Sequence, residues 1–406
     1  MGGPDGGSRA GGPLRTSSRS RLGTAAGFDL APILLFWETT RACGLACRHC
    51  RAEAIARPLP GQLSTAEGLR LIEDLRRFAP RRPVLIFTGG DPFMREDLWE
   101  LSARARAAGL PIGFAPSVTP RLTVEAARRM RAEGARTVSI SLDGADALTH
   151  EGVRGVPGHF AETERAVRML VREGLNVQVN TTVMRGNVEQ LADIAALVAS
   201  WGAHIWEVFF LIKVGRGTAL DELTPKENED VVHVLYEASR YGFIVRTVEA
   251  PFFRRVVAER RALADEVDPA ARFGLGSLYR RLVDRLRAVL GPPGESRAQS
   301  VGTRDGKGIL FVAHDGDVFP AGFLPVRLGN VREDDIVELY RRHPLLRAIR
   351  SASFSGRCGR CEFADTCGGS RSRAYATTGD PLGEDPACAH RPEAGSLPEA
   401  DLGRGP

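Results

Sequence analysis

Between residues 33 and 241, short apolar segments alternate with amphipathic ones, and this alternation constrains the fold more than any other feature of the sequence. The apolar segments have the length and composition of buried strands, and helical periodicity follows each of them. Strands that alternate with helices predict a parallel sheet covered by helices. The expected strands are 33–39, 84–87, 111–115, 137–142, 177–183 and 205–211, and the expected helices are 65–78, 97–108, 124–133, 160–173, 188–201 and 226–241.

Six such units are too few for a closed barrel of eight strands, so we expect an α/β fold built as a partial (β/α)6 TIM-like barrel. Helix-capping residues support the boundaries: Ser64 precedes the first helix, and Gly109 and Gly134 follow later helix ends. In barrels of this kind the chemistry takes place at the C-terminal ends of the strands. Functional residues are therefore expected in the loops that follow the strands.

Composition suggests how the rest of the chain is organised. The first residues are rich in Gly, Ser and Arg and lack the apolar stretch of a secretory signal, so we expect a disordered lead. Near the other end, Asp315-Gly316-Asp317 predicts a hairpin turn that opens a small C-terminal domain. The expected regions are a lead at 1–28, the core at 29–250, a helical bridge at 251–305, the C-terminal domain at 306–392 and a disordered tail at 393–406.

Charge and hydropathy exclude two classes of partner. The chain of 406 residues has no apolar run long enough to span a membrane. Its net charge is +5, but basic residues alternate with acidic ones along the expected helices, which is typical of a solvated face and not of a nucleic-acid-binding stripe. We therefore expect a cytoplasmic protein that binds neither membranes nor nucleic acid.

The seven cysteines fall into two groups. The first group is Cys43, Cys47 and Cys50, and the second is Cys358, Cys361, Cys367 and Cys388. An odd number of cysteines in a cytoplasmic protein argues against a disulfide framework. Closely spaced cysteines in a reducing compartment usually bind metal, so we expect two metal sites.

The first group has the spacing C-x3-C-x2-C in the loop after the first expected strand. Three thiolates on a short loop can hold three irons of a 4Fe–4S cluster, and the fourth iron then stays open to a cofactor or substrate. The alternatives are unliganded thiols or a zinc site. Zinc requires a fourth ligand, and His49 is poorly placed to provide it because it is adjacent to Cys50.

This motif after the first strand resembles that of the radical S-adenosylmethionine (SAM) superfamily, and the similarity covers about residues 33–211. The resemblance implies that Cys43, Cys47 and Cys50 hold the catalytic cluster and that His49 lies near the adenine of SAM. Thr88-Gly89-Gly90-Asp91-Pro92 resembles the superfamily's Gly-Gly-Glu-Pro element, whose glycine backbone binds the SAM amino group. Asp91 stands where Glu is commoner.

Further positions follow from the same resemblance. Ser117 and Thr119 end the third strand, where polar contacts to SAM are often found. The stretch from Ser139 to Gly144, followed by Arg154, is similar to one in maturase-type members. It implies that Ser141 contacts the SAM ribose and that Arg154 contacts the SAM carboxylate, with Asn180 as a weaker candidate. The implied chemistry is reductive cleavage of SAM at the cluster to a 5′-deoxyadenosyl radical, which takes hydrogen from a substrate.

The second group has the spacing C-x2-C-x5-C-x20-C. Four thiolates can saturate a second 4Fe–4S cluster or a structural zinc ion, and spacing alone leaves both open. The segment resembles the SPASM/twitch extension of radical SAM maturases, which carries auxiliary clusters. Ala321 stands where this extension often has a cysteine, so we expect one auxiliary cluster.

Residues 367–388, with Cys367-Gly-Gly-Ser370-Arg and Asp385-Pro-Ala-Cys388, resemble the haem-biosynthesis branch that trims tetrapyrrole side chains, although members of that branch can carry Cys where Ser370 stands. The resemblance implies oxidative modification of a tetrapyrrole-like haem precursor, with flavodoxin or ferredoxin as low-potential electron donor. Arg216, near the end of the sixth strand, is a candidate partner for propionate carboxylates. The alternatives are a maturase of a ribosomally made peptide and, in another class, a non-catalytic iron–sulfur electron carrier.

Overall fold

The computed structural model describes residues 25–264, 266–300 and 302–392, and its centre is one mostly parallel sheet. Strands β1 to β7 pair in chain order, each parallel to the next, so the expected α/β fold is confirmed. These strands are β1 Leu34–Glu38, β2 Val84–Thr88, β3 Ile112–Phe114, β4 Val138–Ser141, β5 Val177–Val183, β6 Ile205–Phe210 and β7 Ile244–Val248.

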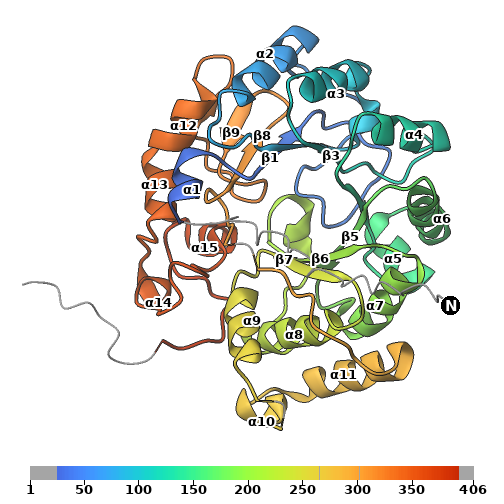
Figure 1. Ribbon diagram of the computed structural model, residues 1–406, viewed down its shortest axis with the longest axis vertical. Coiled ribbons are helices and arrows are strands. Elements are labelled where there is room, and N and C mark those ends of the chain that lie inside the picture. Colours follow the sequence, from blue (N-terminus) through green and yellow to red (C-terminus); the bar gives the residue numbers. More distant parts are fainter. Residues whose placement is uncertain (1–24, 265, 301, 393–406) are drawn as a thin grey trace, which may run out of the picture.

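Helices follow the strands and cover the outside of the sheet (Figure 1). They are α2 Thr65–Leu75, α3 Leu98–Ala107, α4 Val124–Ala132, α5 Ala147–Arg154, α6 His159–Arg172, α7 Leu191–Ser200, α8 Pro225–Ala238 and α9 Phe253–Arg261, with short 3-10 turns η1 Pro92–Met94, η2 Val188–Gln190 and η3 Gly215–Ala219. Capping boxes start α2 at Ser64 with Glu67 and α8 at Thr224 with Glu227.

The two faces of the strands differ in burial. In β2, Leu85 and Phe87 are fully buried against the helices, whereas Val84, Ile86 and Thr88 are only half-buried on the opposite face. This alternation follows from the two-residue period of a strand. The inner face of the sheet therefore stays accessible, and the loops after its strands surround the candidate site.

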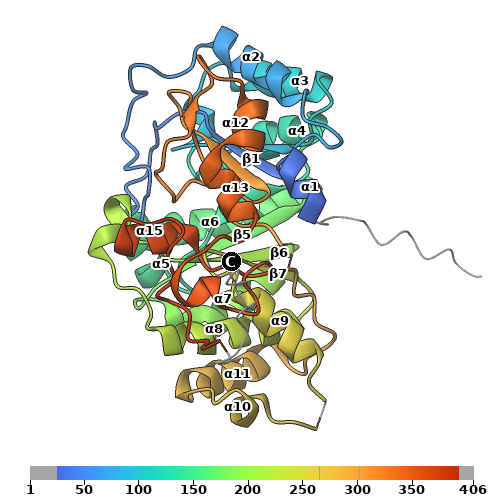
Figure 2. The ribbon, with the colours of Figure 1, turned by 90° about the vertical axis from the view of Figure 1, so that its left-hand side faces the viewer.

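The C-terminal part of the chain joins the same sheet. Strand β8 Ile309–Val312 pairs in parallel with the free edge of β1, and β9 Asp317–Phe319 and β10 Gly329–Asn330 continue the sheet in antiparallel fashion. The expected hairpin is confirmed by the β8–β9 pair. The remaining helices are α1 Ala25–Leu30, α10 Pro269–Arg272, α11 Ser277–Leu290, α12 Ile336–Arg342, α13 Pro344–Arg350, α14 Gly356–Gly359 and α15 Arg371–Thr378 (Figures 1 and 2).

The structure differs from the sequence expectations at three elements. β7 is a seventh parallel strand that the alternation did not reveal, and α5 was not expected. The expected lead at 1–28 overlaps α1, which begins at Ala25, and Phe28 is buried, with its carbonyl accepting from Tyr340 Oη (2.6 Å). The rest of the expected lead and the expected tail lie outside the described residues. None of the helices in the described ranges has the length and apolar content needed to cross a bilayer.

Candidate active site

The three-cysteine loop lies between β1 and α2, at the C-terminal end of β1. All three residues are free cysteines, and each sulfur has a polar hydrogen nearby. The Leu45 N–H donates to Cys43 Sγ (3.4 Å), the Ala54 N–H donates to Cys50 Sγ (3.5 Å), and a guanidinium N–H of Arg154 donates to Cys47 Sγ (3.5 Å). Such donors stabilise thiolates, which are the form that binds metal.

Two glycines bring the loop after β2 against this loop. The Gly90 N–H donates to Thr40 O and the Asp91 N–H donates to Ala42 O, both at 2.7 Å. A Cβ at Gly89, where φ is +153°, would lie 2.4 Å from Thr40 O, and one at Gly90 would lie 2.3 Å from Ala42 O. Glycine is therefore required here for close backbone packing, whether or not a cofactor is bound.

The carboxylate of Asp91 is fully buried and is used within the protein. It accepts hydrogen bonds from the Phe93 N–H (3.2 Å), the Ser117 N–H (3.4 Å) and the Thr119 hydroxyl (3.0 Å). Burial raises its pKa, although these donors oppose the shift. Asp91 thus fixes the loop after β3, and the Ser117 hydroxyl is placed 3.4 Å from Cys43 Sγ.

Asp143, just after β4, joins two of the expected site residues. Its Oδ2 lies 3.1 Å from His49 Nε2 and 2.5 Å from Arg154 Nη2, and its Oδ1 accepts the Thr182 N–H (2.8 Å). Burial acts against ionisation, but the Arg154 guanidinium and His49 hold the pKa of Asp143 well below its usual range. The carboxylate is therefore ionised and orients both partners toward the cysteine loop. His49 Nδ1 and Arg154 Nε are buried and have no hydrogen-bond partner within the described structure.

Behind Asp143, two histidines connect neighbouring loops. The Asp143 N–H donates to His150 Nδ1 (3.1 Å), His150 Nε2 lies 2.8 Å from His159 Nδ1, and His159 Nε2 lies 3.2 Å from Val118 O. Because His150 Nδ1 accepts, its Nε2 carries the hydrogen, and the same assignment applies to His159. Burial, followed by Arg154, lowers the pKa of both rings, so both are neutral. This relay links the loops after β3 and β4.

Ser141 and Asn180 face each other in register on β4 and β5, and both are half-buried on the inner face of the sheet. The Gln178 side-chain amide donates to Asn180 Oδ1 and to Glu207 Oε2, both at 2.8 Å. Burial raises the pKa of Glu207. The inner face beside the cysteine loop is therefore polar and hydrogen-bonded.

The second group of cysteines lies around α14 and the start of α15. All four are free, and backbone N–H groups of Asp385, Phe363 and Gly369 donate to Cys358, Cys361 and Cys367 at 3.4, 3.4 and 3.5 Å. Burial raises the pKa of Cys367 to about 11 and that of Cys388 to about 12, so metal binding here must release protons. The structure thus brings the four residues into one segment with sulfur-directed donors.

Known proteins are similar to this chain over most of its length. A family model described as the radical SAM superfamily matches residues 37–198. The chain is 36% identical to the AdoMet-dependent heme synthase of Nitratidesulfovibrio vulgaris, over 88% of this chain and 92% of that protein. It is 33% identical to the mycofactocin maturase MftC of Mycobacterium ulcerans, over 88% of each.

The chain belongs to the radical SAM superfamily. A crystal structure of Streptococcus suis SuiB bound to S-adenosylmethionine shares the fold with a TM-score of 0.62 at 14% identity, over 89% of this chain and 78% of that one. Enzymes of the superfamily use SAM and a 4Fe–4S cluster. This chain is therefore a radical SAM enzyme, and the alternative of a non-catalytic electron carrier is set aside.

Two parts of this radical SAM enzyme's site were not found from the sequence. Asp143 was visible within a motif but was not recognised as the residue that joins His49 to Arg154. The His150–His159 relay depends on α5 and on contacts across loops, for which local sequence gives no signal. The backbone N–H of Arg216 donates to Cys50 O (3.1 Å), and its guanidinium donates to Ala54 O (3.4 Å) while Nε and Nη2 are buried without a partner in the described structure, so its pairing with substrate carboxylates stays a prediction.

Proposed function

We propose that this enzyme binds SAM at a 4Fe–4S cluster held by Cys43, Cys47 and Cys50, and that it oxidatively modifies a haem-precursor tetrapyrrole. The observation that carries the proposal is the connection of the three-cysteine loop to His49 and Arg154 through the buried Asp143. When bound and reduced, the cluster cleaves SAM and supplies a 5′-deoxyadenosyl radical.

The chain's own residues bind and orient the cofactor. Arg154 keeps a buried N–H without a partner, which we assign to the carboxylate of SAM. The backbone of Gly89 and Gly90 is assigned to the SAM amino group, and Asp91 joins this loop to the loop after β3. We assign the unpartnered ring nitrogen of His49 to the adenine side of SAM.

The hydroxyl groups of Ser117 and Ser141 are assigned to further SAM contacts, with Ser141 at the ribose. Ser117 lies beside Cys43, and Ser141 lies on the half-buried inner face. Hydroxyls suit these positions because they both donate and accept hydrogen bonds. They leave the remaining inner face of the sheet for the substrate.

We assign the second group, Cys358, Cys361, Cys367 and Cys388, to one auxiliary 4Fe–4S cluster. Four thiolates on one zinc ion, with Zn–S of about 2.3 Å, would lie roughly 4 Å from one another. Ligand atoms of three or more His, Cys, Asp or Glu residues come within 4.8 Å of one another at one place among the described residues. These residues are Cys361, Glu362 and His390. No three cysteine sulfurs of either group therefore lie within 4.8 Å of one another in the described structure, whereas ligands of one zinc ion would.

The substrate assignment rests on the relatives. The heme synthase is the more similar of the two named relatives and is aligned over nearly its whole length. The similarity to MftC favours a second candidate, the modification of a ribosomally made peptide. Flavodoxin or ferredoxin is the proposed electron donor.

Anaerobic reconstitution tests the proposal. We expect about eight irons per chain and release of 5′-deoxyadenosine after addition of dithionite and SAM. Zinc in place of iron, together with no SAM cleavage, would refute it. Mass spectrometry of reactions with iron-coproporphyrin, compared with reactions on candidate precursor peptides, then decides between the two substrate classes.

A further inference from the structure

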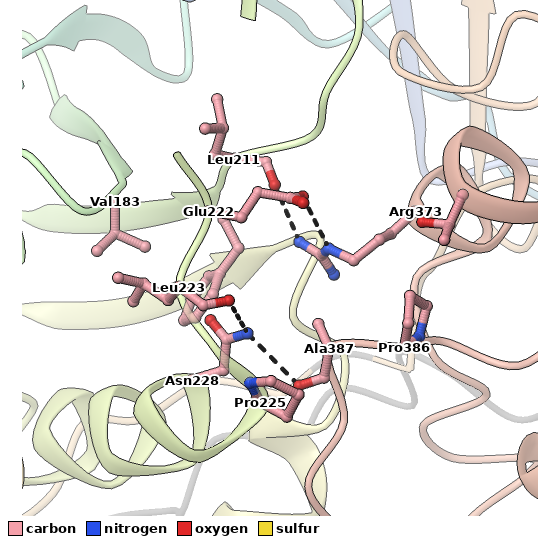
Figure 3. A pocket seen from close by; sticks show the side chains of 11 residues that line it. Val183, Leu211, Glu222, Leu223, Pro225, Asn228, Arg373, Pro386 and Ala387 are labelled. Carbon is pink, nitrogen blue, oxygen red and sulfur yellow. Dashed lines mark hydrogen bonds and ion pairs between the residues drawn. The ribbon is translucent and has the colours of Figure 1, made fainter. Parts of the chain in front are cut away.

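A cavity of about 240 Å³ lies where the C-terminal ends of β5 and β6 meet the C-terminal cysteine segment (Figure 3). Most of its wall is apolar, and the charged groups gather on one side, where Arg373 from α15 reaches toward Glu222 and the carbonyl of Leu211. The apolar lining is Val183, Phe210, Leu211, Leu223, Pro225, Pro386 and Ala387.

Arg373 is 4% exposed and is held firmly on two sides. Its guanidinium donates to Leu211 O (3.2 Å) after β6 and to Glu249 O (2.9 Å) after β7, and it lies 3.4 Å from the carboxylate of Asp385. Glu249 has a φ of +61°, which is unusual for a residue with a side chain. These contacts fix the cation at the C-terminal ends of two strands.

On its third side the guanidinium of Arg373 makes one weak contact, with Glu222. Its Nε lies 3.4 Å from Glu222 Oε1, and the Glu222 side chain is 30% exposed whereas that of Arg373 is 5% exposed. A single long contact to a partly hydrated carboxylate is the kind of ion pair that contributes little energy. Glu222 belongs to the segment between η3 and α8, so it can turn outward without disturbing a strand.

The charges around Arg373 allow another carboxylate to take the place of Glu222. Burial and the neighbouring Asp305 raise the pKa of Glu249, which opposes ionisation of its carboxyl group near Arg373. Asp385 is shared with the N–H groups of Ser370 (2.8 Å) and Ala387 (3.0 Å). Replacing Glu222 by a ligand carboxylate conserves the net charge and leaves no buried cation unpaired.

We propose that this cavity is a subsite for one alkyl-carboxylate arm of the substrate, in which the ligand carboxylate displaces Glu222 from Arg373. The aliphatic carbons of the arm would contact the apolar wall. The cavity is smaller than the roughly 300–1,000 Å³ of pockets that enclose a whole drug-sized ligand, so it fits an arm and not a macrocycle. This inference rests on the proposed tetrapyrrole substrate and identifies the group by which that substrate is held.

The test measures binding to the reconstituted enzyme without reductant, by fluorescence titration with coproporphyrin III and with its neutral tetraamide. We expect the wild type to bind the acid at least tenfold more tightly than the amide, because a hydrogen bond from a guanidinium to a carboxylate is stronger than one to a neutral amide. Glu222→Ala should tighten binding of the acid about fivefold and leave the amide unchanged, since it removes the competing carboxylate. Ala387→Leu should weaken binding of the acid by filling the cavity.

Control variants and ligands distinguish failure of the subsite proposal from failure of the proposed function. Glu189→Ala removes an exposed ion pair with Arg281 that does not line the cavity, and should change neither affinity. Arg373→Gln is less informative because Arg373 also holds two strand ends. Equal binding of acid and amide, or no effect of Glu222→Ala on the acid, would overturn the inference while SAM cleavage persists. Tight binding of a deca-glutamate peptide without binding of the porphyrin would overturn the tetrapyrrole assignment.

Discussion

Asp143→Asn should show how much SAM binding depends on the positioning of Arg154 and His49, because the variant keeps the residues that bind the cluster. The amide can still accept the Thr182 N–H, but it removes the charge that pairs with Arg154 and His49. All seven cysteines and the glycine loop remain in place. Any loss therefore reports on the positioning of the two side chains.

The expected magnitude follows from burial. The Asp143 side chain is 1% exposed and that of Arg154 is 9% exposed, so the pair is poorly screened by solvent. Removing one partner of a buried pair costs about 3–5 kcal/mol, and the retained hydrogen bond places this variant at about 3 kcal/mol. For 406 residues at roughly 2 cal/mol/K of unfolding entropy each, the melting temperature should fall by about 4 °C. SAM affinity should fall at least tenfold, as for the loss of a hydrogen bond to a charged group.

The assay is anaerobic calorimetry of SAM binding to reconstituted protein, paired with a thermal melt. Glu229→Gln is the matched control, because Glu229 forms a buried ion pair with Arg255 (2.6 Å) on α8 and α9 and lies outside the site. It should lose similar stability and bind SAM normally. Unchanged SAM affinity in Asp143→Asn, or an equal loss of affinity in both variants, would refute the reasoning.

Gly90→Ala should leave the three-cysteine site low in iron, because the added Cβ would lie 2.3 Å from Ala42 O. The iron content is measured after reconstitution, and full occupancy would contradict this prediction. Cys43→Ala should retain about four irons and release no 5′-deoxyadenosine. Cys367→Ala should lose the iron of the auxiliary cluster and still cleave SAM. The reverse pattern would contradict the assignment of the two cysteine groups. The pKa of Glu229 is lowered to about 2, so its stabilisation is complete above about pH 4.5 and disappears as the pH falls toward 2. The difference in melting temperature between wild type and Glu229→Gln should thus be constant from pH 8 to 5 and shrink below it, and a difference that grows would be inconsistent.

Local sequence signals predicted the parts of the fold that local physics determines. The apolar segments from β1 to β6 were found because a strand buried on one or both faces must be apolar over its own length. β7 was missed because Arg246 interrupts its apolar run, and its place in the sheet is fixed by pairing with β6. The parallel pairing of β8 with β1 joins segments more than 270 residues apart, and no local pattern records it.

The site shows the same division between local and long-range information. The cysteine spacings were readable because each group needs several ligands on a short segment. The roles of Gly89 and Gly90 in backbone packing became visible only once the loops after β1 and β2 were brought together. Asp143 lies in a recognisable motif, but its contacts to His49 and Arg154 are made across loops, and Glu222 has no distinctive neighbours in sequence.

Two buried arginines form separate networks of contacts around the candidate site. Arg154 connects Asp143, His49 and the three-cysteine loop, whereas Arg373 connects the ends of β6 and β7 to the C-terminal segment. No hydrogen bond or ion pair in the described structure joins the two networks directly. Substitutions without shared partners usually have additive effects. Asp143→Asn and Glu222→Ala should therefore change SAM binding and carboxylate binding independently, so that cofactor and substrate affinities are set by different parts of the fold.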